Sequence, residues 1–177
     1  MAAPPSASQA VEIVAAAAGE RIVVERLMQL YHYDFSEFAA PDGPHGELDE
    51  RGIFPYSHLE GYWSGGCCEA LLIRRRGRLA GCVLLNEWSL SGRRVDRVMA
   101  EFFVMRKYRR LGVGTRVART VLGARPGLWE IGIAHYNKPA EAFWRSVVSS
   151  FPDTDSETLR GDGQRWSGPI LRLRVRP

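Results

Sequence analysis

The spacing of hydrophobic residues predicts a chain of alternating strands and helices. Between residues 20 and 38 the apolar positions recur at steps of three and four, which is the period of one amphipathic helix. A run of consecutive apolar residues marks the strand predicted over 96–105 as a central one. Near the end of the chain, Leu171, Leu173 and Val175 alternate with arginines, which predicts a strand with one solvent-exposed face.

The remaining pattern predicts a mixed α/β sheet with helices on both faces. A basic turn at 74–78 joins two strands as a hairpin, and a long Gly- and Pro-rich connection covers 39–66. Residues 1–9 are rich in Ala, Pro and Ser and are expected to form a disordered tail, which leaves one domain over 10–177. The other predicted elements are strands 10–16, 69–73, 79–87 and 129–135 and helices 112–122 and 139–148.

Composition favours an ordinary globular protein. The chain has 177 residues, 45% hydrophobic and 25% charged, which is enough for one domain with its own core. No apolar run reaches 18 residues and no secretory signal is visible, so neither a membrane span nor export is expected. Cys67, Cys68 and Cys82 show neither disulfide nor metal-ligand spacing, which favours reduced thiols, a cytoplasmic location and no metal site.

Charge is distributed unevenly along the chain. Residues 1–66 carry a net charge of −7, whereas residues 67–177 carry +11, and 22 of the 24 basic residues are arginine. No Asp or Glu occurs between Phe102 and Trp129, although this stretch holds seven Arg or Lys residues. We therefore expect an anionic ligand on the second half of the chain and a cationic substrate near the first.

The segment 101–115 combines a strand, a basic turn, a glycine loop and the start of a helix. A helix start presents unpaired N–H groups and partial positive charge, and glycine allows a phosphate to approach them. The loop lacks the Lys-Ser or Lys-Thr of a P-loop and the third glycine of a dinucleotide fold. The sequence therefore predicts a pyrophosphate site formed by Arg109, Arg110, Leu111, Gly112, Val113, Gly114 and Thr115.

A second motif, 137–144, follows the next predicted strand and reads Asn-Lys-Pro-Ala-Glu-Ala-Phe-Trp. Together with the Arg-x-x-Gly-x-Gly motif at 109–114, it resembles the GNAT acetyltransferase superfamily over about residues 67–148. The resemblance implies a mostly antiparallel mixed sheet of six to seven strands with a splayed parallel pair in the middle. It also implies acetyl-CoA as co-substrate and an amine as acceptor.

The resemblance further implies roles for individual residues. The backbone of Phe103, Val104 and Met105 would pair with the pantetheine arm, and Asn137 would hydrogen bond near it. Phe143 and Trp144 would line the thioester end. The family often has Tyr where this chain has Trp144, and an indole N–H is no proton source near neutral pH. The general acid would then be Tyr136, His135 or the proton leaving the substrate through water, with Trp144 only packing.

Transfer to an amine needs a base, because an alkylamine is mostly protonated at pH 7. Glu101 is the leading candidate, since a carboxylate among apolar neighbours is either paired or functional, and Glu87 is the second. The structural alternative for Glu101 is an ion pair with Arg94 or Arg97. The acceptor site is expected at the end of the first helix, at Tyr31, Asp34 and Glu37, with aromatic and acidic residues of the loop 39–66 nearby.

Two other functions are compatible with the sequence. A basic nucleic-acid-binding module would use the arginines at 74–78, 172, 174 and 176, but no helix-turn-helix, zinc or RNP motif accompanies them, so nucleic acid is an unexpected partner. The other alternative function is that of a GNAT-fold protein that binds acyl-CoA without transferring the acyl group. The acceptor is expected to be a small-molecule or peptide amine, with no membrane partner, and homodimer formation is compatible with the family.

Overall fold

The computed structural model describes residues 10–42, 46–151 and 154–177. The predicted tail at 1–9 lies outside them. Seven strands form one sheet in the order β1-β2-β3-β4-β5-β7-β6. The strands are β1 Val11–Ala15, β2 Glu69–Arg75, β3 Arg78–Asn86, β4 Arg97–Val104, β5 Gly127–Gly132, β6 Ser156–Arg160 and β7 Pro169–Val175. Within the described part of the chain only β4 and β5 are parallel neighbours, which confirms the predicted mixed sheet with a parallel pair in the middle.

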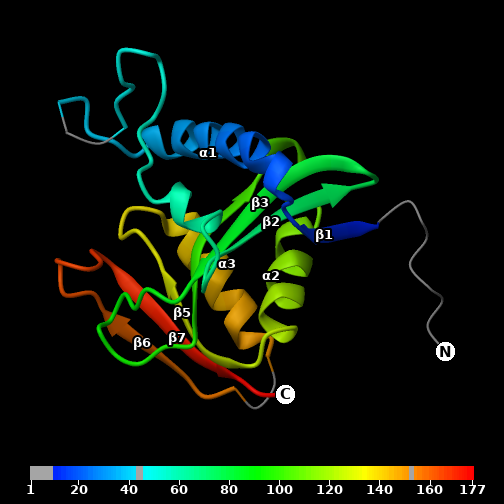
Figure 1. The fold of residues 1–177 in the computed structure, drawn as a ribbon. Coiled ribbons are helices and arrows are strands. Elements are labelled where there is room, and N and C mark those ends of the chain that lie inside the picture. The colour runs from blue at the N-terminus through cyan, green and yellow to red at the C-terminus, as the bar shows by residue number, and fades with distance from the viewer. Residues whose placement is uncertain (1–9, 43–45, 152–153) are drawn as a thin grey trace.

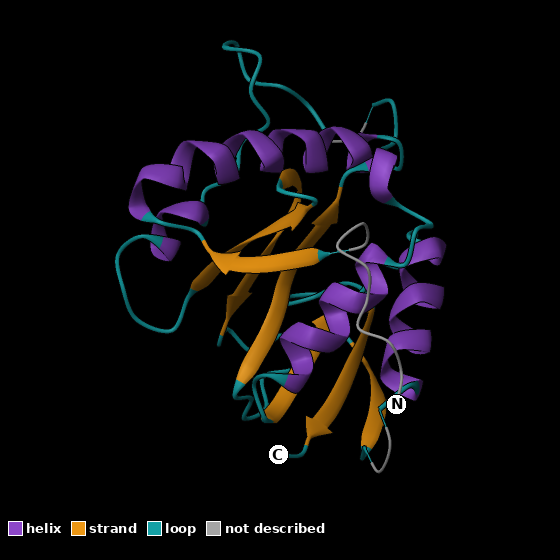
Figure 2. Ribbon diagram, turned by 90° about the vertical axis from the view of Figure 1, so that its right-hand side faces the viewer, coloured by secondary structure: helices purple, strands orange, loops and turns teal. Residues whose placement is uncertain are grey.

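Three α-helices cover the sheet, α1 (Arg21–Ser36) on one face and α2 (Val113–Gly123) and α3 (Lys138–Ser149) on the other (Figures 1 and 2). Val24, Leu27 and Met28 recur at helical spacing on α1 and are buried against Leu72, Cys82, Leu84 and Phe103. On the other face, α2 and α3 bury Val117, Val121, Leu122, Trp144 and Val147 against the sheet. Two hydrophobic layers therefore hold the central strands between the helices.

The C-terminal strand differs from its prediction at one position. Leu171, Leu173 and Val175 form a buried face and Arg174 is exposed, as expected, but Arg172 on the same face as Arg174 is 9% exposed. It is buried because β7 lies between β5 and β6 rather than at an edge, and because Glu130 of β5 faces it. The unpredicted strand β6 (Ser-Glu-Thr-Leu-Arg) has a single apolar residue, so hydrophobic spacing could not reveal it.

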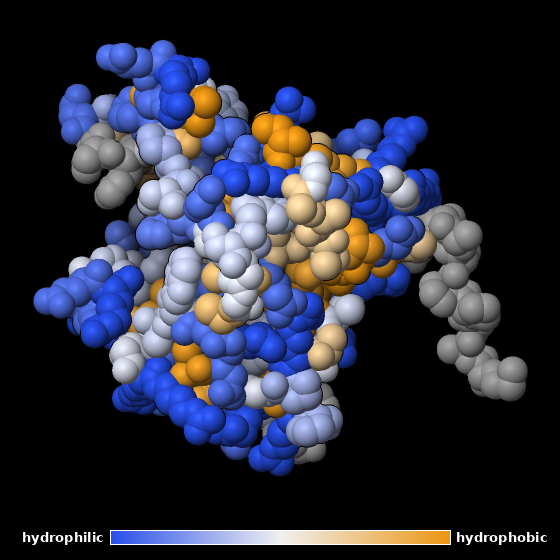
Figure 3. Space-filling model, in the orientation of Figure 1, coloured by the Kyte–Doolittle hydropathy of each residue, from blue (hydrophilic) through white to orange (hydrophobic). Residues whose placement is uncertain are grey.

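One edge of the sheet is formed by β1. Hydrophobic side chains gather beside this strand on a face that is otherwise mostly hydrophilic (Figure 3), and Val14 is 40% exposed. Homodimer formation stays a prediction. No helix among the described residues combines the length and apolar content needed to cross a lipid bilayer.

Candidate active site

The sheet opens between its two parallel strands. β4 and β5 pair only over three positions, from Arg97 opposite Trp129 to Met99 opposite Ile131. A bulge interrupts β4 at the same level, because Leu84 of β3 lies opposite Glu101 and Leu85 lies opposite Met99, so that Ala100 is extra. Bulges increase the local twist and end regular pairing. The second half of β4 therefore diverges from β5, and Glu101 lies at the start of the opening between them.

The backbone direction of β4 decides which groups face this opening. The N–H of Met105 donates to the carbonyl of Ala80 at 2.9 Å, and its carbonyl accepts from the N–H of Tyr108 at 2.8 Å. Successive strand residues point their backbone groups to opposite sides, so Phe103 also faces β3 and Phe102 and Val104 face β5. Of the three residues predicted to pair with pantetheine, the structure directs only Val104 to the opening, and it adds Phe102.

The two glycines of the predicted phosphate loop have different roles. Gly112 adopts φ +75° at the start of α2, and a Cβ there would meet no atom within 4 Å. A Cβ on Gly114, by contrast, would lie 3.4 Å from the ring of Phe143 on α3. Gly112 therefore leaves room for a ligand at the helix start, whereas Gly114 allows α2 and α3 to pack closely.

A basic cavity of about 410 Å³ lies beside Gly112. Arg75 of β2 and Arg116 of α2 line it, and none of its described lining residues carries a carboxylate. Arg75 also lies over the ring of Tyr108, at 5.9 Å from its centroid. Sequence reasoning did not assign these two arginines to the site, although the acid-free stretch contains Arg116. Open space at Gly112 with cations beside it fits the phosphates of an acyl-CoA.

The basic turn also binds α1. Asp34 is held by Nε of Arg106 at 2.7 Å and by the guanidinium of Arg109, and Arg109 Nε donates to the carbonyl of Val104 at 2.7 Å. Glu37 lies 3.7 Å from Arg106. The first-half acids and second-half cations therefore meet here directly. Arg110, Leu111 and Thr115, also predicted in the phosphate loop, are exposed beside this turn, and Val113 is buried.

Glu101 is a partly buried carboxylate on the α1 side of the opening. Burial raises its pKa from the ordinary value of 4.5 to about 7, and the hydroxyls of Tyr31 and Tyr56 oppose the rise. The hydroxyl of Tyr56 donates to Oε1 of Glu101 at 3.0 Å. No ion pair of Glu101 occurs among the described residues; Arg97 lies 3.6 Å from Glu87 and Arg94 lies 3.7 Å from Asp96. A carboxylate with a pKa near neutrality is suited to accept a proton.

The expected acceptor residues lie in two places. Tyr31 interacts with Glu101 and packs on Phe103, with ring centroids 5.9 Å apart. Asp34 and Glu37 instead bind the basic turn, so their charge is already compensated. Tyr56 reaches Glu101 from the long loop, and hydrophobic spacing could not have revealed this because the path of an irregular loop leaves no periodic signal.

The residues of the second motif lie around the start of α3. Oδ1 of Asn137 accepts from the N–H of Ala140 at 3.1 Å and caps the helix, so its side-chain NH₂ is the group that can serve a ligand. Phe143 and Trp144 pack edge to face at 5.0 Å, and Trp144 also packs on Phe102. Trp144 is 6% exposed and belongs to the core below the opening.

Tyr136 packs on Phe38 and His135 rather than directly on Tyr31 or Tyr56. Its ring is 45% exposed and stacks on Phe38 beyond the end of α1, with centroids 5.4 Å apart. His135 packs edge to face against it at 5.0 Å. The structure thus places Tyr136 and His135 in the turn after β5, and their role as general acid stays a prediction.

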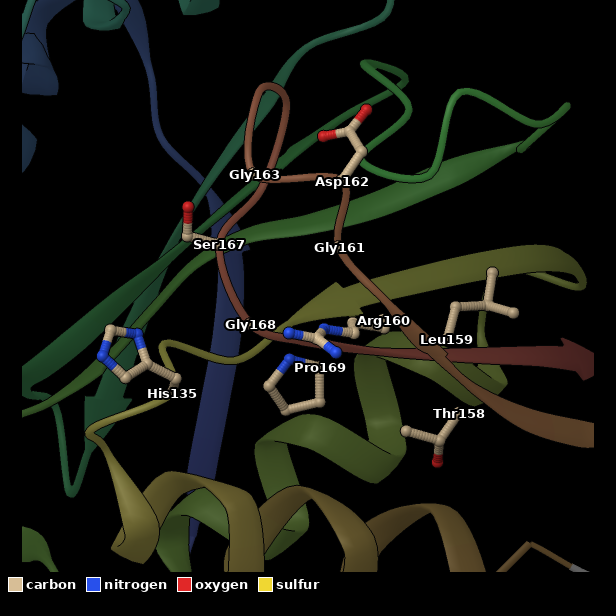
Figure 4. Close-up of a pocket in the computed structure, with 10 residues that line it drawn as sticks. All are labelled: His135, Thr158, Leu159, Arg160, Gly161, Asp162, Gly163, Ser167, Gly168 and Pro169. Carbon is tan, nitrogen blue, oxygen red and sulfur yellow. The ribbon is translucent and has the colours of Figure 1, made fainter.

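His135 also lines a cavity of about 870 Å³ between the end of β5 and the β6–β7 hairpin. In Figure 4, His135, Arg160 and Pro169 lie on the side of α3, while Asp162 and Ser167 extend away from it. None of the described residues that line this cavity belongs to β4, so Glu101 does not line it.

Comparison with known proteins agrees with this geometry. The model of the acetyltransferase (GNAT) family matches residues 25–147, so the chain belongs to the GNAT family of acetyltransferases. An acetyltransferase from Thermus thermophilus has a similar structure, with a TM-score of 0.65, 9% identity, and coverage of 94% of this chain and 97% of that one. The predicted family and the predicted acyltransferase class are thereby confirmed.

Two further structures share the fold. The ribosomal-protein-S18-alanine N-acetyltransferase of Escherichia coli has a TM-score of 0.55 and 12% identity, covering 94% of this chain and 93% of that one. A chimeric spermidine N-acetyltransferase from Vibrio cholerae has a TM-score of 0.56 and 11% identity, covering 93% and 94%. A search among curated proteins found no match.

Proposed function

We propose that this protein transfers an acetyl group from acetyl-CoA to the amine of a small or peptide-like, cationic acceptor. The observation that carries the proposal is the carboxylate of Glu101, placed at the bulge where β4 and β5 separate and poised to accept a proton near pH 7. Similar folds include a ribosomal-protein-S18-alanine N-acetyltransferase and a spermidine N-acetyltransferase, which supports an amine acceptor. A CoA donor and three unpaired thiols are consistent with a cytoplasmic enzyme.

The proposed donor site lies along the opening and the start of α2. Phe102 and Val104 would hydrogen bond the pantetheine through their backbone, and the NH₂ of Asn137 would face it from the start of α3. The phosphates would lie at Gly112, with Arg75, Arg110 and Arg116 beside them. The acetyl group supplies the electrophilic carbonyl, and a β4 backbone N–H near the bulge would stabilise its developing negative charge.

The proposed chemistry is direct attack. Glu101, directly or through one water, removes a proton from the acceptor's ammonium, because only the neutral amine has a nucleophilic lone pair. The nitrogen then bonds to the acetyl carbon, the carbon–sulfur bond breaks, and the thiolate leaves with a proton from Tyr136, from His135 or from the substrate. The buried thiol of Cys82, with its pKa raised by burial to about 12, is not required as a nucleophile.

The first test is ligand-dependent stability followed by turnover. Acetyl-CoA and CoA should raise the thermal midpoint and ATP should not, since a ligand at 100 times its Kd adds about 2.7 kcal/mol. Thiol release from acetyl-CoA should then appear on addition of a suitable amine. Stabilisation without thiol release across primary amines, a polyamine and peptide N-termini would favour the non-catalytic alternative. If CoA does not raise the thermal midpoint, the proposed donor site is wrong.

Replacing Gly112 by valine should abolish stabilisation by acetyl-CoA, because the side chain would occupy the open space at the start of α2. The backbone strain at φ +75° adds a cost of about 1–2 kcal/mol to folding. Gly163→Val is a matched control, since Gly163 has φ +77° and equally open surroundings in the β6–β7 turn. It should lose comparable stability and keep the acetyl-CoA response; equal responses in both variants would contradict the loop assignment.

A further inference from the structure

A segment of the long connection is fixed over Glu101. We call residues 53–63 the aromatic loop. Phe54 exchanges two hydrogen bonds with the side-chain amide of Gln29 on α1, at 2.8 and 3.1 Å. Farther along the loop, the Asn86 amide of β3 donates to the hydroxyl of Tyr62 at 3.2 Å. Between these two attachments Tyr56 reaches the carboxylate, so the loop approaches Glu101 with both its ends anchored.

We propose that Tyr56 is the positioning residue of the acceptor site: its hydroxyl holds Oε1 of Glu101 and, with Tyr31 as the second phenol at the carboxylate, orients Glu101 toward the acceptor's ammonium. The inference rests on the proposed function, in which Glu101 is the base. A fixed donor at one oxygen of a carboxylate also fixes the direction of the second oxygen. Fewer orientations of the carboxylate are then unproductive for proton transfer. The aromatic loop therefore connects the proposed acceptor site directly to Glu101, the proposed base.

The titratable groups around Glu101 are mostly phenols. Those near its carboxylate are Tyr31 of α1, Tyr56 and Tyr62 of the aromatic loop, and Cys82 of β3. His32 of α1 contacts Tyr56. His32 packs on Tyr56 at 5.3 Å, and burial lowers its pKa, so it is neutral at pH 7. Among the described residues no cation forms an ion pair with Glu101, and hydroxyl donors are what favours its ionised form.

Tyr56 remains a donor across the working range of the enzyme. Burial and the nearby carboxylate raise the pKa of its phenol well above the ordinary value of 10, so the hydroxyl keeps its proton at neutral and mildly basic pH. A phenol in this state cannot compete with Glu101 for the acceptor's proton. It can only orient the carboxylate and stabilise its charge.

The test is a pH titration of Glu101 in the Tyr56→Phe protein. Carboxyl ¹³C NMR monitors the titration, with no substrate present. The Glu101 signal is assigned by its loss in Glu101→Gln. Removing the hydroxyl should move the midpoint upward by about one pH unit, the order of one hydrogen bond. The acidic limb of kcat/KM should move with it. Tyr33→Phe is the matched control, because it removes a phenol of α1 that is 65% exposed and is no anchor of the aromatic loop, and it should leave both midpoints in place.

A second variant keeps the test independent of how well Tyr56→Phe folds. Gln29→Leu removes the anchor of Phe54 without touching the phenol, and it should shift the Glu101 midpoint in the same direction. An unchanged midpoint in folded Tyr56→Phe overturns the positioning role even if Glu101→Gln is inactive. If Glu101→Gln is fully active while the Glu101 midpoint still shifts in Tyr56→Phe, the assignment of Glu101 as the base, on which the proposal rests, is overturned instead.

Discussion

Glu101→Gln should lose acetyl transfer by about 10²–10⁴-fold, the usual contribution of a positioned base. The amide has nearly the same shape and can still accept from Tyr56, but it cannot take up the acceptor's proton. The assay is thiol release from acetyl-CoA with an amine that the wild type turns over. Glu87→Gln is the matched control, because Glu87 follows the end of the neighbouring strand β3 and pairs with Arg97 at 3.6 Å. It should stay near wild-type activity.

The same variant should be more stable than the wild type above pH 7. The folded-state pKa of Glu101 is raised from 4.5 to about 7, so the folded protein holds a proton that the unfolded chain releases. Stability from this group is present below the unfolded pKa and is lost as pH rises through about 7. Full loss corresponds to about 3 kcal/mol at about 1.4 kcal/mol per pH unit, an upper bound for a partly exposed group.

Chemical unfolding at pH 5 and pH 8 measures the effect. The gap between Glu101→Gln and wild type should widen in favour of the variant at the higher pH. A gap that is equal at both pH values would mean that the carboxylate is not desolvated. If Glu87→Gln rather than Glu101→Gln removes activity, the base is Glu87.

Glu130→Gln should lower the stability of the fold by about 3–5 kcal/mol, the cost of leaving a buried partner charge uncompensated. Glu130 is fully buried and binds the guanidinium of Arg172 at 2.5 Å. It also accepts from the N–H of Leu90 at 2.8 Å and of Ser91 at 3.2 Å, which fixes the connection between β3 and β4. For a chain of this length the thermal midpoint should fall by on the order of 10 °C.

Glu157→Gln is the control for this ion pair. Glu157 lies 3.5 Å from the same arginine, but its side chain is 50% exposed, so its loss should cost less than about 1 kcal/mol. The double variant Glu130→Met, Arg172→Met should recover much of the loss, because both buried charges disappear together. Equal midpoints for Glu130→Gln and Glu157→Gln would show that burial contributes nothing to the pair.

Most elements of the sheet follow from local patterns in the sequence. Hydrophobic spacing located α1 through Val23, Leu27, Leu30, Tyr31, Phe35 and Phe38, although the helix buries Val24, Leu27 and Met28 and leaves Leu30 48% exposed. The glycines and the asparagine at the starts of α2 and α3 are local signals too. Arg172 of β7 shows the limit of such reasoning. Alternation describes which residues share a face, but whether that face is wet depends on the neighbouring strand, which the sequence does not order.

The candidate site was predictable where a motif defines it and unpredictable where a distant contact does. Glu101 stands out as an acid among apolar neighbours, and Gly112 stands out at the start of a helix. The link from Asp34 to Arg106 and Arg109 joins residues more than 70 positions apart, and that from Tyr56 to Glu101 spans 45. Charge counting indicated that the two halves attract each other, but it could not distinguish an acceptor site from an internal contact.

The extra residue in β4 affects how related sequences should be compared. Ala100 and Glu101 are consecutive, yet both lie on the α1 side, whereas Met99 and Phe102 lie on the side of α2 and α3. Side chains of a regular strand alternate, so deleting one residue here would turn the carboxylate away from Tyr31 and Tyr56. An alignment that runs β4 through without a gap can therefore match an acid that faces the other way. In comparisons with this chain, the counterpart of Glu101 should be traced by counting residues from the bulge as well as by identity.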